Sequence, residues 1–144
     1  IMVSNVALSV ADRVAIPVDR ELIRQGGLFH DIGRARSHDI HHALAGVKIG
    51  RELGFSEQLL SIIERHIGAG ITATEAERLG LPKKDYLPVT PEEKIVSYAD
   101  NLTKGSEPML FEQAMERFRE ILGPGHEGIG FLVRQHEEIQ GWMR

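Results

Sequence analysis

The chain has 144 residues, of which 42% are hydrophobic and 26% are charged, and its formal net charge is -4. That length fits one domain with a buried core, and the acidic balance argues against binding to a nucleic-acid duplex. Cysteine is absent, which excludes disulfides, thiolate metal sites and cysteine nucleophiles. The sequence has neither the ~20 apolar residues of a membrane helix nor the basic start of a signal peptide, so we expect a cytoplasmic protein without membrane contacts.

Apolar residues recur at the helical spacing of three and four along almost the whole chain. Val3, Ala7 and Val10 begin the first of these stripes, and a polar stretch over 34–39 is predicted to be a loop. No alternating strand pattern of useful length, internal repeat or low-complexity segment is present. The predicted helices cover 3–16, 19–33, 42–53, 57–67, 74–80, 91–102, 111–122 and a last stretch around 132–143. The predicted fold is therefore all-α, a compact helical bundle with a single domain over 1–144.

Several of the predicted helices begin with capping residues. Ser56 is expected to cap the fourth helix, because a serine hydroxyl accepts hydrogen bonds from free backbone N–H groups. Thr74 and Glu77 have the spacing of a capping box for a short helix. Thr90 followed by Pro91 is the strongest start, because proline suits the first helical position.

Five side chains that can bind metal are predicted to point inward from four separate helices. They are His30, Asp31, His42, His66 and Asp100. Any single histidine on an apolar face is more often an ordinary core residue. Burying several ionisable groups together is costly unless a partner compensates their charge, and a divalent cation would be such a partner. Imidazole and carboxylate ligands without sulfur suit Mn, Fe, Co, Ni, Zn or Mg, so the pattern predicts a site for one or two divalent ions.

The run Leu-Phe-His-Asp-Ile-Gly-Arg over 28–34 resembles the HDIG signature of the HD superfamily, which is named for its adjacent His and Asp metal ligands. Three further segments follow in the family's order, over 42–46, 63–66 and 94–102. The resemblance covers nearly the whole chain and implies the helical HD-domain fold. Within the superfamily the sequence is similar to small, stand-alone HDIG proteins of archaea and thermophilic bacteria.

The resemblance also implies a ligand set. His30, Asp31 and Asp100 would hold a first metal together with a histidine of the first helix, whose position falls just before Ile1. We therefore expect the sequence to lack a short N-terminal segment of that helix. Larger HD phosphodiesterases use a second metal, to which Asp31 would bridge, and this makes Asp31 the main catalytic candidate. The remaining ligands of the second metal would be His42 and His66.

The function implied by this resemblance is hydrolysis of a phosphate ester by metal-activated water. Two ions roughly 3.5–4 Å apart can activate a shared water and stabilise displacement at phosphorus. A small phosphorylated partner is expected, either a nucleotide or a cyclic phosphodiester, cleaved by a phosphomonoesterase or phosphodiesterase activity. Arg34 and Lys104 are placed in the sequence to reach its phosphate. A homo-oligomer is compatible with the sequence, although no residue pattern indicates one.

Two other functions are compatible with the same residues. HD-fold oxygenases use a di-iron centre with these ligand types, so a redox enzyme is one alternative. The other is a non-catalytic regulatory or assembly domain, which the position of the first histidine before Ile1 leaves open. Metal content separates the non-catalytic domain from the two enzymes. Oxygen consumption separates the oxygenase from the hydrolase.

Overall fold

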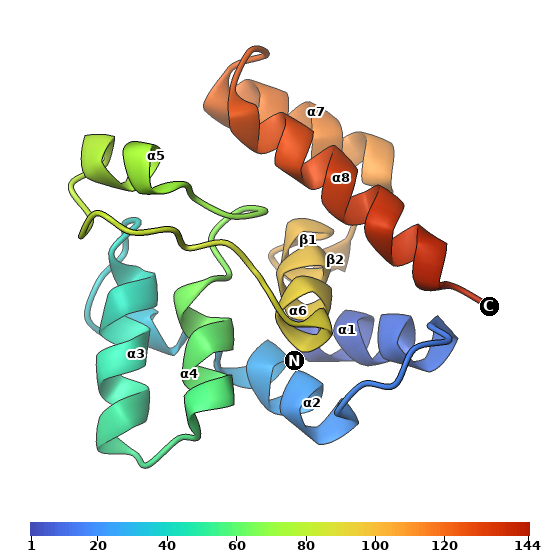
Figure 1. The fold of residues 1–144 in the computed structure, drawn as a ribbon, viewed down its shortest axis with the longest axis horizontal. Helices are drawn as coiled ribbons and strands as arrows, with labels where there is room; N and C mark the ends of the chain where they lie inside the picture. Colours follow the sequence, from blue (N-terminus) through green and yellow to red (C-terminus); the bar gives the residue numbers. More distant parts are fainter.

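A computed structural model describes all residues from 1 to 144, and it confirms the predicted all-α, single-domain fold (Figure 1). Regular structure consists of eight α-helices, one 3-10 helix and two short strands. The elements in order are α1 (Met2–Arg13), α2 (Arg20–Phe29), η1 (Ile32–Ala35), α3 (His42–Glu52), α4 (Glu57–Glu64), α5 (Ala73–Arg78), α6 (Pro91–Asn101), β1 (Thr103–Lys104), β2 (Glu107–Pro108), α7 (Phe111–Leu122) and α8 (Glu127–Trp142). None of the helices combines the length and the apolar character needed to span a bilayer.

Helix α6 lies at the centre of the bundle and packs against α1, α2, α4 and α8. Figure 1 shows α3 and α4 side by side to one side of it, with the α7–α8 pair on the other. Ile23, Ile62, Ile95 and Ile139 are essentially fully buried where these helices meet. Apolar residues of α1, α2, α4, α6 and α8 form the main core, and two smaller clusters lie elsewhere. Helix α6 leads from the main core to Asp100 near its C-terminal end.

The two ends of the chain are joined by a short extended pairing. Val14 forms an isolated bridge with Met143, and the Ala15 N–H donates to the carbonyl of Trp142 at 2.6 Å. This pairing explains why α1 ends at Arg13 rather than continuing to the predicted end near Pro17. Val14 takes an extended conformation to reach the C-terminal segment.

Predicted helix caps are partly confirmed. Ser56 accepts a hydrogen bond from the Leu59 N–H, and Thr90 caps α6 in the same way. The predicted capping box at Thr74 is wrong, because Thr72 caps α5 instead. Ile71, the residue before the true cap, pairs with Tyr86 in an isolated bridge, so the chain is still extended when it reaches Thr72.

Three further differences concern short elements. Helix α2 ends at Phe29, before the predicted end at Gly33. The expected loop over 34–39 begins inside η1, which spans Ile32–Ala35. The hairpin of β1 and β2 was not predicted, because strands of two residues are too short to show an alternating pattern.

Gly33 allows η1 to lie directly against α3. A Cβ atom at Gly33 would lie 1.7 Å from the carbonyl oxygen of His42 and 2.5 Å from the amide nitrogen of Gly46. Gly46 in turn faces Ile63 of α4, where an added Cβ would lie 2.7 Å from a side-chain carbon. Because Gly33 and Gly46 have no side chains, the segment after His30 and Asp31 can pack directly against the start of α3.

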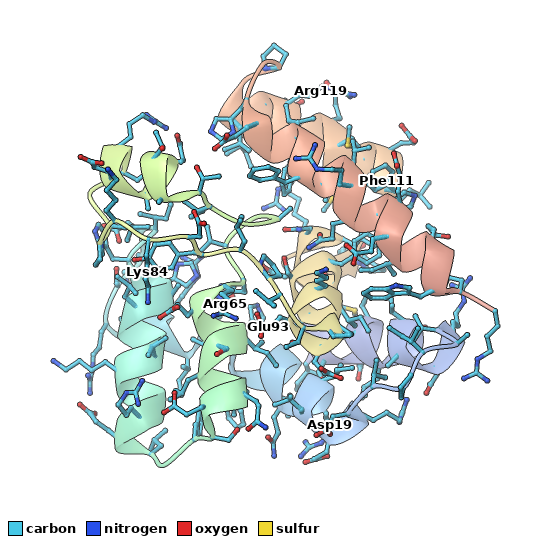
Figure 2. The ribbon with its side chains drawn as sticks, viewed as in Figure 1. Asp19, Arg65, Lys84, Glu93, Phe111 and Arg119 are labelled. Carbon is cyan, nitrogen blue, oxygen red and sulfur yellow. The ribbon has the colours of Figure 1, made fainter.

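A partly buried ion pair joins α4 to α6. Arg65 and Glu93 lie next to each other in Figure 2, and their Nη1 and Oε1 atoms are 2.8 Å apart. Glu93 is buried and also accepts a hydrogen bond from the Val89 N–H at 3.0 Å. Because Arg65 immediately precedes His66, this pair helps to fix the position of His66 relative to α6.

We expect Gly33→Ala to lower the free energy of unfolding by about 3 kcal/mol or more, because the added methyl group overlaps backbone that has little room to move. Urea unfolding of the variant checks this. Gly141→Ala is the matched control, since open space surrounds that position on α8 and alanine favours helix. Equal stability of the two variants would contradict the packing argument.

Candidate metal centre

The structure brings all five predicted ligands into one site. His30 caps the end of α2, Asp31 follows it, and His42 is the first residue of α3. His66 lies two residues beyond the end of α4, and Asp100 is the second-last residue of α6. The three histidines are buried, whereas the Asp31 side chain is 45% exposed. Buried imidazoles thus surround a carboxylate that remains open to a ligand.

Each of the three histidines is oriented by its own backbone. In every case Nδ1 lies close to the carbonyl oxygen three residues earlier: 2.8 Å for His30, 2.7 Å for His42 and 2.7 Å for His66. A carbonyl can only accept, so Nδ1 carries the proton and donates it. When such a ring is neutral, its Nε2 atom is left with a free lone pair. A histidine in this tautomer, held by a backbone carbonyl, can bind a metal through Nε2.

These Nε2 atoms converge on Asp31. Oδ1 of Asp31 lies 3.2 Å from Nε2 of His42 and 3.4 Å from Nε2 of His66. The two Nε2 atoms are 3.0 Å apart. With both Nδ1 atoms protonated, two lone pairs face each other across this distance, which is favourable only when a positive charge lies between them. His42, His66 and Asp31 therefore form a group that could hold a metal ion.

A second group lies on the other side of the same carboxylate. Nε2 of His30 is 3.3 Å from Oδ2 of Asp31 and 3.3 Å from Oδ1 of Asp100. It is buried, and neither contact has the geometry of a hydrogen bond. Burial alone would lower the pKa of His30, but the nearby carboxylates of Asp100 and Asp31 raise it to about 10. The two carboxylates therefore favour a positive charge at this position, either a proton on Nε2 or a bound cation.

The electrostatics of Asp31 agree with this arrangement. Partial burial would raise the pKa of its carboxyl group, but the contacts with His30, His42 and His66 hold the pKa well below its usual range. Asp31 is therefore ionised at any physiological pH. Its two oxygens face different groups of ligands, as a carboxylate that bridges two cations would.

The spacing of the ligand atoms fits divalent metal binding. Nitrogen and oxygen ligands about 2.1 Å from one ion lie roughly 3.0–3.4 Å from each other in octahedral to tetrahedral coordination. The contacts among His42, His66 and Asp31 span 3.0 to 3.4 Å, and those of His30 with Asp31 and Asp100 are both 3.3 Å. With imidazole and carboxylate donors only, this set does not select a single metal.

Buried polar contacts support α6 near this site. The Asn101 side chain donates to Gln135 of α8 at 3.0 Å, and Gln135 donates to Ser97 at 3.1 Å. The Ser97 hydroxyl then donates to the carbonyl of Gly68, two residues after His66, at 2.8 Å. This chain of hydrogen bonds connects the segments carrying Asp100 and His66 to α8.

The ligands line a cavity of about 810 Å³, and Arg34 lies on its edge. Nε of Arg34 is 3.6 Å from Oδ1 of Asp31, and its contact with a substrate phosphate stays a prediction. Lys104 does not line the cavity. Thr103 is buried and Lys104 is exposed, because successive residues of a strand point to opposite faces.

Arg117 of α7 lines the cavity instead of Lys104, and no sequence pattern selects it. It lies far along the chain from Asp31, on a helix whose sequence predicts only an apolar stripe. Its one distinguishing feature is environmental: it is partly buried and makes no ion pair. That feature emerges only when α7 is seen packed over the site.

The model of the HD-domain family matches residues 1–105, which contain all five clustered side chains. The chain belongs to the HD-domain family. The matched region ends just after β1, so α7 and α8 lie beyond it. The HDIG resemblance of the sequence is thereby confirmed.

Curated relatives extend this match. An uncharacterized protein of Methanocaldococcus jannaschii is 48% identical over 140 residues, which cover 97% of this chain and 82% of that protein. A tRNA (cytidine(56)-2'-O)-methyltransferase of Picrophilus torridus is 42% identical, over 95% of this chain but only 39% of the relative. A ribonuclease Y of Pseudothermotoga lettingae is 32% identical, over 82% of this chain and 20% of the relative. The chain thus resembles one part of these two larger enzymes.

Among solved structures, the HD domain of the phosphodiesterase PgpH from L. monocytogenes has the same fold. The two superimpose with a TM-score of 0.54, over 97% of this chain and 89% of the other, at 18% sequence identity. At that identity the likeness establishes the shared fold. It extends over α7 and α8 as well as the region matched by the family.

We expect His66→Ala to bind one metal ion fewer per chain than the unmodified protein, because it removes one of the three ligand atoms of the group formed by His42, His66 and Asp31. Elemental analysis of the purified proteins measures this. His38→Ala is the control, since His38 lines the same cavity but its side chain makes no hydrogen bond or ion pair. An unchanged metal count in His66→Ala would remove His66 from the ligand set.

Proposed function

We propose that this protein is a metal-dependent phosphohydrolase that cleaves a phosphate ester of a small nucleotide, either a monoester or a cyclic diester, with a metal-activated water. One observation carries the proposal: three Nε2 atoms, on rings oriented by backbone carbonyls, converge on the ionised Asp31. Divalent ions held there would polarise a phosphoryl oxygen and lower the pKa of a bound water. His42 and His66 would hold one ion, and His30 with Asp100 the other.

The protein's own groups supply the remaining requirements. Asp31 would orient both ions through its two oxygens, which face different histidines. Arg34, half-exposed on the cavity edge, would bind a non-bridging phosphate oxygen through its planar group of donors. The buried imidazoles leave one side of the site open to the cavity, where a phosphate can approach.

The comparisons support phosphoester chemistry without naming a substrate. The relative called ribonuclease Y and the solved phosphodiesterase domain are both named for cleavage of phosphodiesters. The match to ribonuclease Y covers a fifth of that enzyme, so it supports a role for this domain rather than an action on RNA. The net charge of -4 favours a small substrate over a long polyanion.

We expect Asp31→Asn to lower metal-dependent hydrolysis by at least about a hundredfold, because the neutral amide cannot hold two cations through charged oxygens. The assay follows phosphate release from mononucleotides and ring opening of cyclic nucleotides, and circular dichroism checks that the helices persist. Glu120→Gln, on the exposed side of α7, is the control. Wild-type rates in Asp31→Asn would refute this role.

The oxygenase alternative gives a separate prediction. If hydrolysis is the reaction, phosphate release should proceed equally well under nitrogen and with Mn²⁺ or Mg²⁺ as the only added metal. An oxygen electrode run in parallel measures consumption. Iron-dependent oxygen uptake without phosphate release would contradict the hydrolase proposal and favour the oxygenase.

A further inference from the structure

Helix α7 forms one wall of the cavity that holds the candidate metal centre. Arg117, Phe118, Ile121 and Leu122 all line this cavity. Their spacing places them on one face of the helix, since residues three or four positions apart are neighbours on a helix surface. The cavity volume of about 810 Å³ lies within the roughly 300–1,000 Å³ typical of small-molecule sites.

Arg117 is the one arginine or lysine that is partly buried and yet forms no ion pair. Arg65 and Lys94 are also partly buried, but each pairs with a glutamate. The Arg117 side chain donates a hydrogen bond from Nη1 to the carbonyl oxygen of Thr103 at 3.3 Å. A guanidinium has five donors, so most of them remain available inside the cavity. An anionic group of a ligand would satisfy them.

The neighbouring residues of the same face are apolar and open. Ile121 is 67% exposed and Leu122 is 38% exposed, and Leu28 on α2, 39% exposed, lines the same cavity. Phe118 adds an aromatic ring to this wall. A ligand that covers these side chains must therefore have a flat or apolar part next to its anionic part.

We propose that α7 is the substrate-recognition wall and that its ligand is a nucleotide. Arg117 binds a phosphate oxygen, while the face formed by Phe118, Ile121 and Leu122 covers the base. A simple sugar phosphate fits less well, because its hydroxyl groups would lie against apolar side chains without partners. This proposal rests on the proposed function for the fate of the phosphate, and it adds the residues that select the substrate.

The test is isothermal titration of the full, as-purified chain with three probes: AMP, ribose 5-phosphate and inorganic phosphate. Arg117→Gln should raise the Kd of AMP and of ribose 5-phosphate by about tenfold, because a charged hydrogen bond is lost. Ile121→Ser should raise the Kd of AMP about threefold and leave that of ribose 5-phosphate unchanged. Where AMP is consumed during titration, its KM replaces Kd.

Matched controls exclude general effects. Arg119→Gln removes an exposed arginine of the same helix, labelled in Figure 2, which pairs with Glu116 and does not line the cavity. Leu53→Ser removes an exposed apolar side chain outside the cavity. Arg117→Lys should recover part of the lost affinity, since it keeps the charge but loses the planar donor group.

Two results would overturn the inference: equal loss of AMP affinity in Arg117→Gln and Arg119→Gln, or AMP and ribose 5-phosphate binding equally in every variant. Metal-dependent hydrolysis of p-nitrophenyl phosphate is measured in the same proteins. If that activity is present while AMP binding is insensitive to α7, the recognition wall fails and the hydrolase stands. If AMP binding depends on α7 while no phosphoester is cleaved, the hydrolase fails and the wall stands.

Discussion

The site depends on one repeated contact: the hydrogen bond from Nδ1 of a histidine to the carbonyl three residues earlier. Gly27, Asp39 and Ile63 provide these carbonyls for His30, His42 and His66. Without this hydrogen bond each ring could turn either nitrogen toward Asp31, and the position of its metal-binding nitrogen would not be fixed. The backbone therefore sets the chemistry of the site, and the helix ends that expose these carbonyls matter as much as the histidines.

Two glycines, Gly27 and Gly33, allow backbone segments to pack closely and bring those helix ends together. Gly27 lies against α1, where an added Cβ would be 2.4 Å from the Cα of Ser4, and Gly33 lies against the carbonyl of His42. One contact fixes α2 before His30, and the other fixes the segment after Asp31. The adjacent His-Asp pair is thus held on both sides by backbone-to-backbone packing. The glycine of the HDIG run has a structural purpose, because it lets Asp31 and His42 approach to 3.2 Å.

The fold could be predicted because it depends on helical periodicity over long segments, whereas the set of five clustered side chains also needed the HDIG resemblance, since Asp31 and His42 have no clear place on a stripe. His30, His66 and Asp100 continue apolar stripes, so their inward direction followed from spacing. Lys104 was placed by counting one helical turn from Asp100, but α6 ends at Asn101 and a strand begins. A strand of two residues leaves no periodic signal, and this is why its side-chain direction could not be predicted.

The C-terminal helices show a different limit. Arg117 is separated from Asp31 by most of the chain, so its place in the cavity follows only from how α7 and α8 fold back over α6. The same pair completes the core, since Ile139 is fully buried, and Gln135 of α8 supports the end of α6. Because the family match stops at residue 105, the five clustered side chains and the α7 wall of the cavity belong to different parts of the chain. Under the proposed function, substitutions on α7 of this chain would change ligand recognition and leave the five clustered side chains in place.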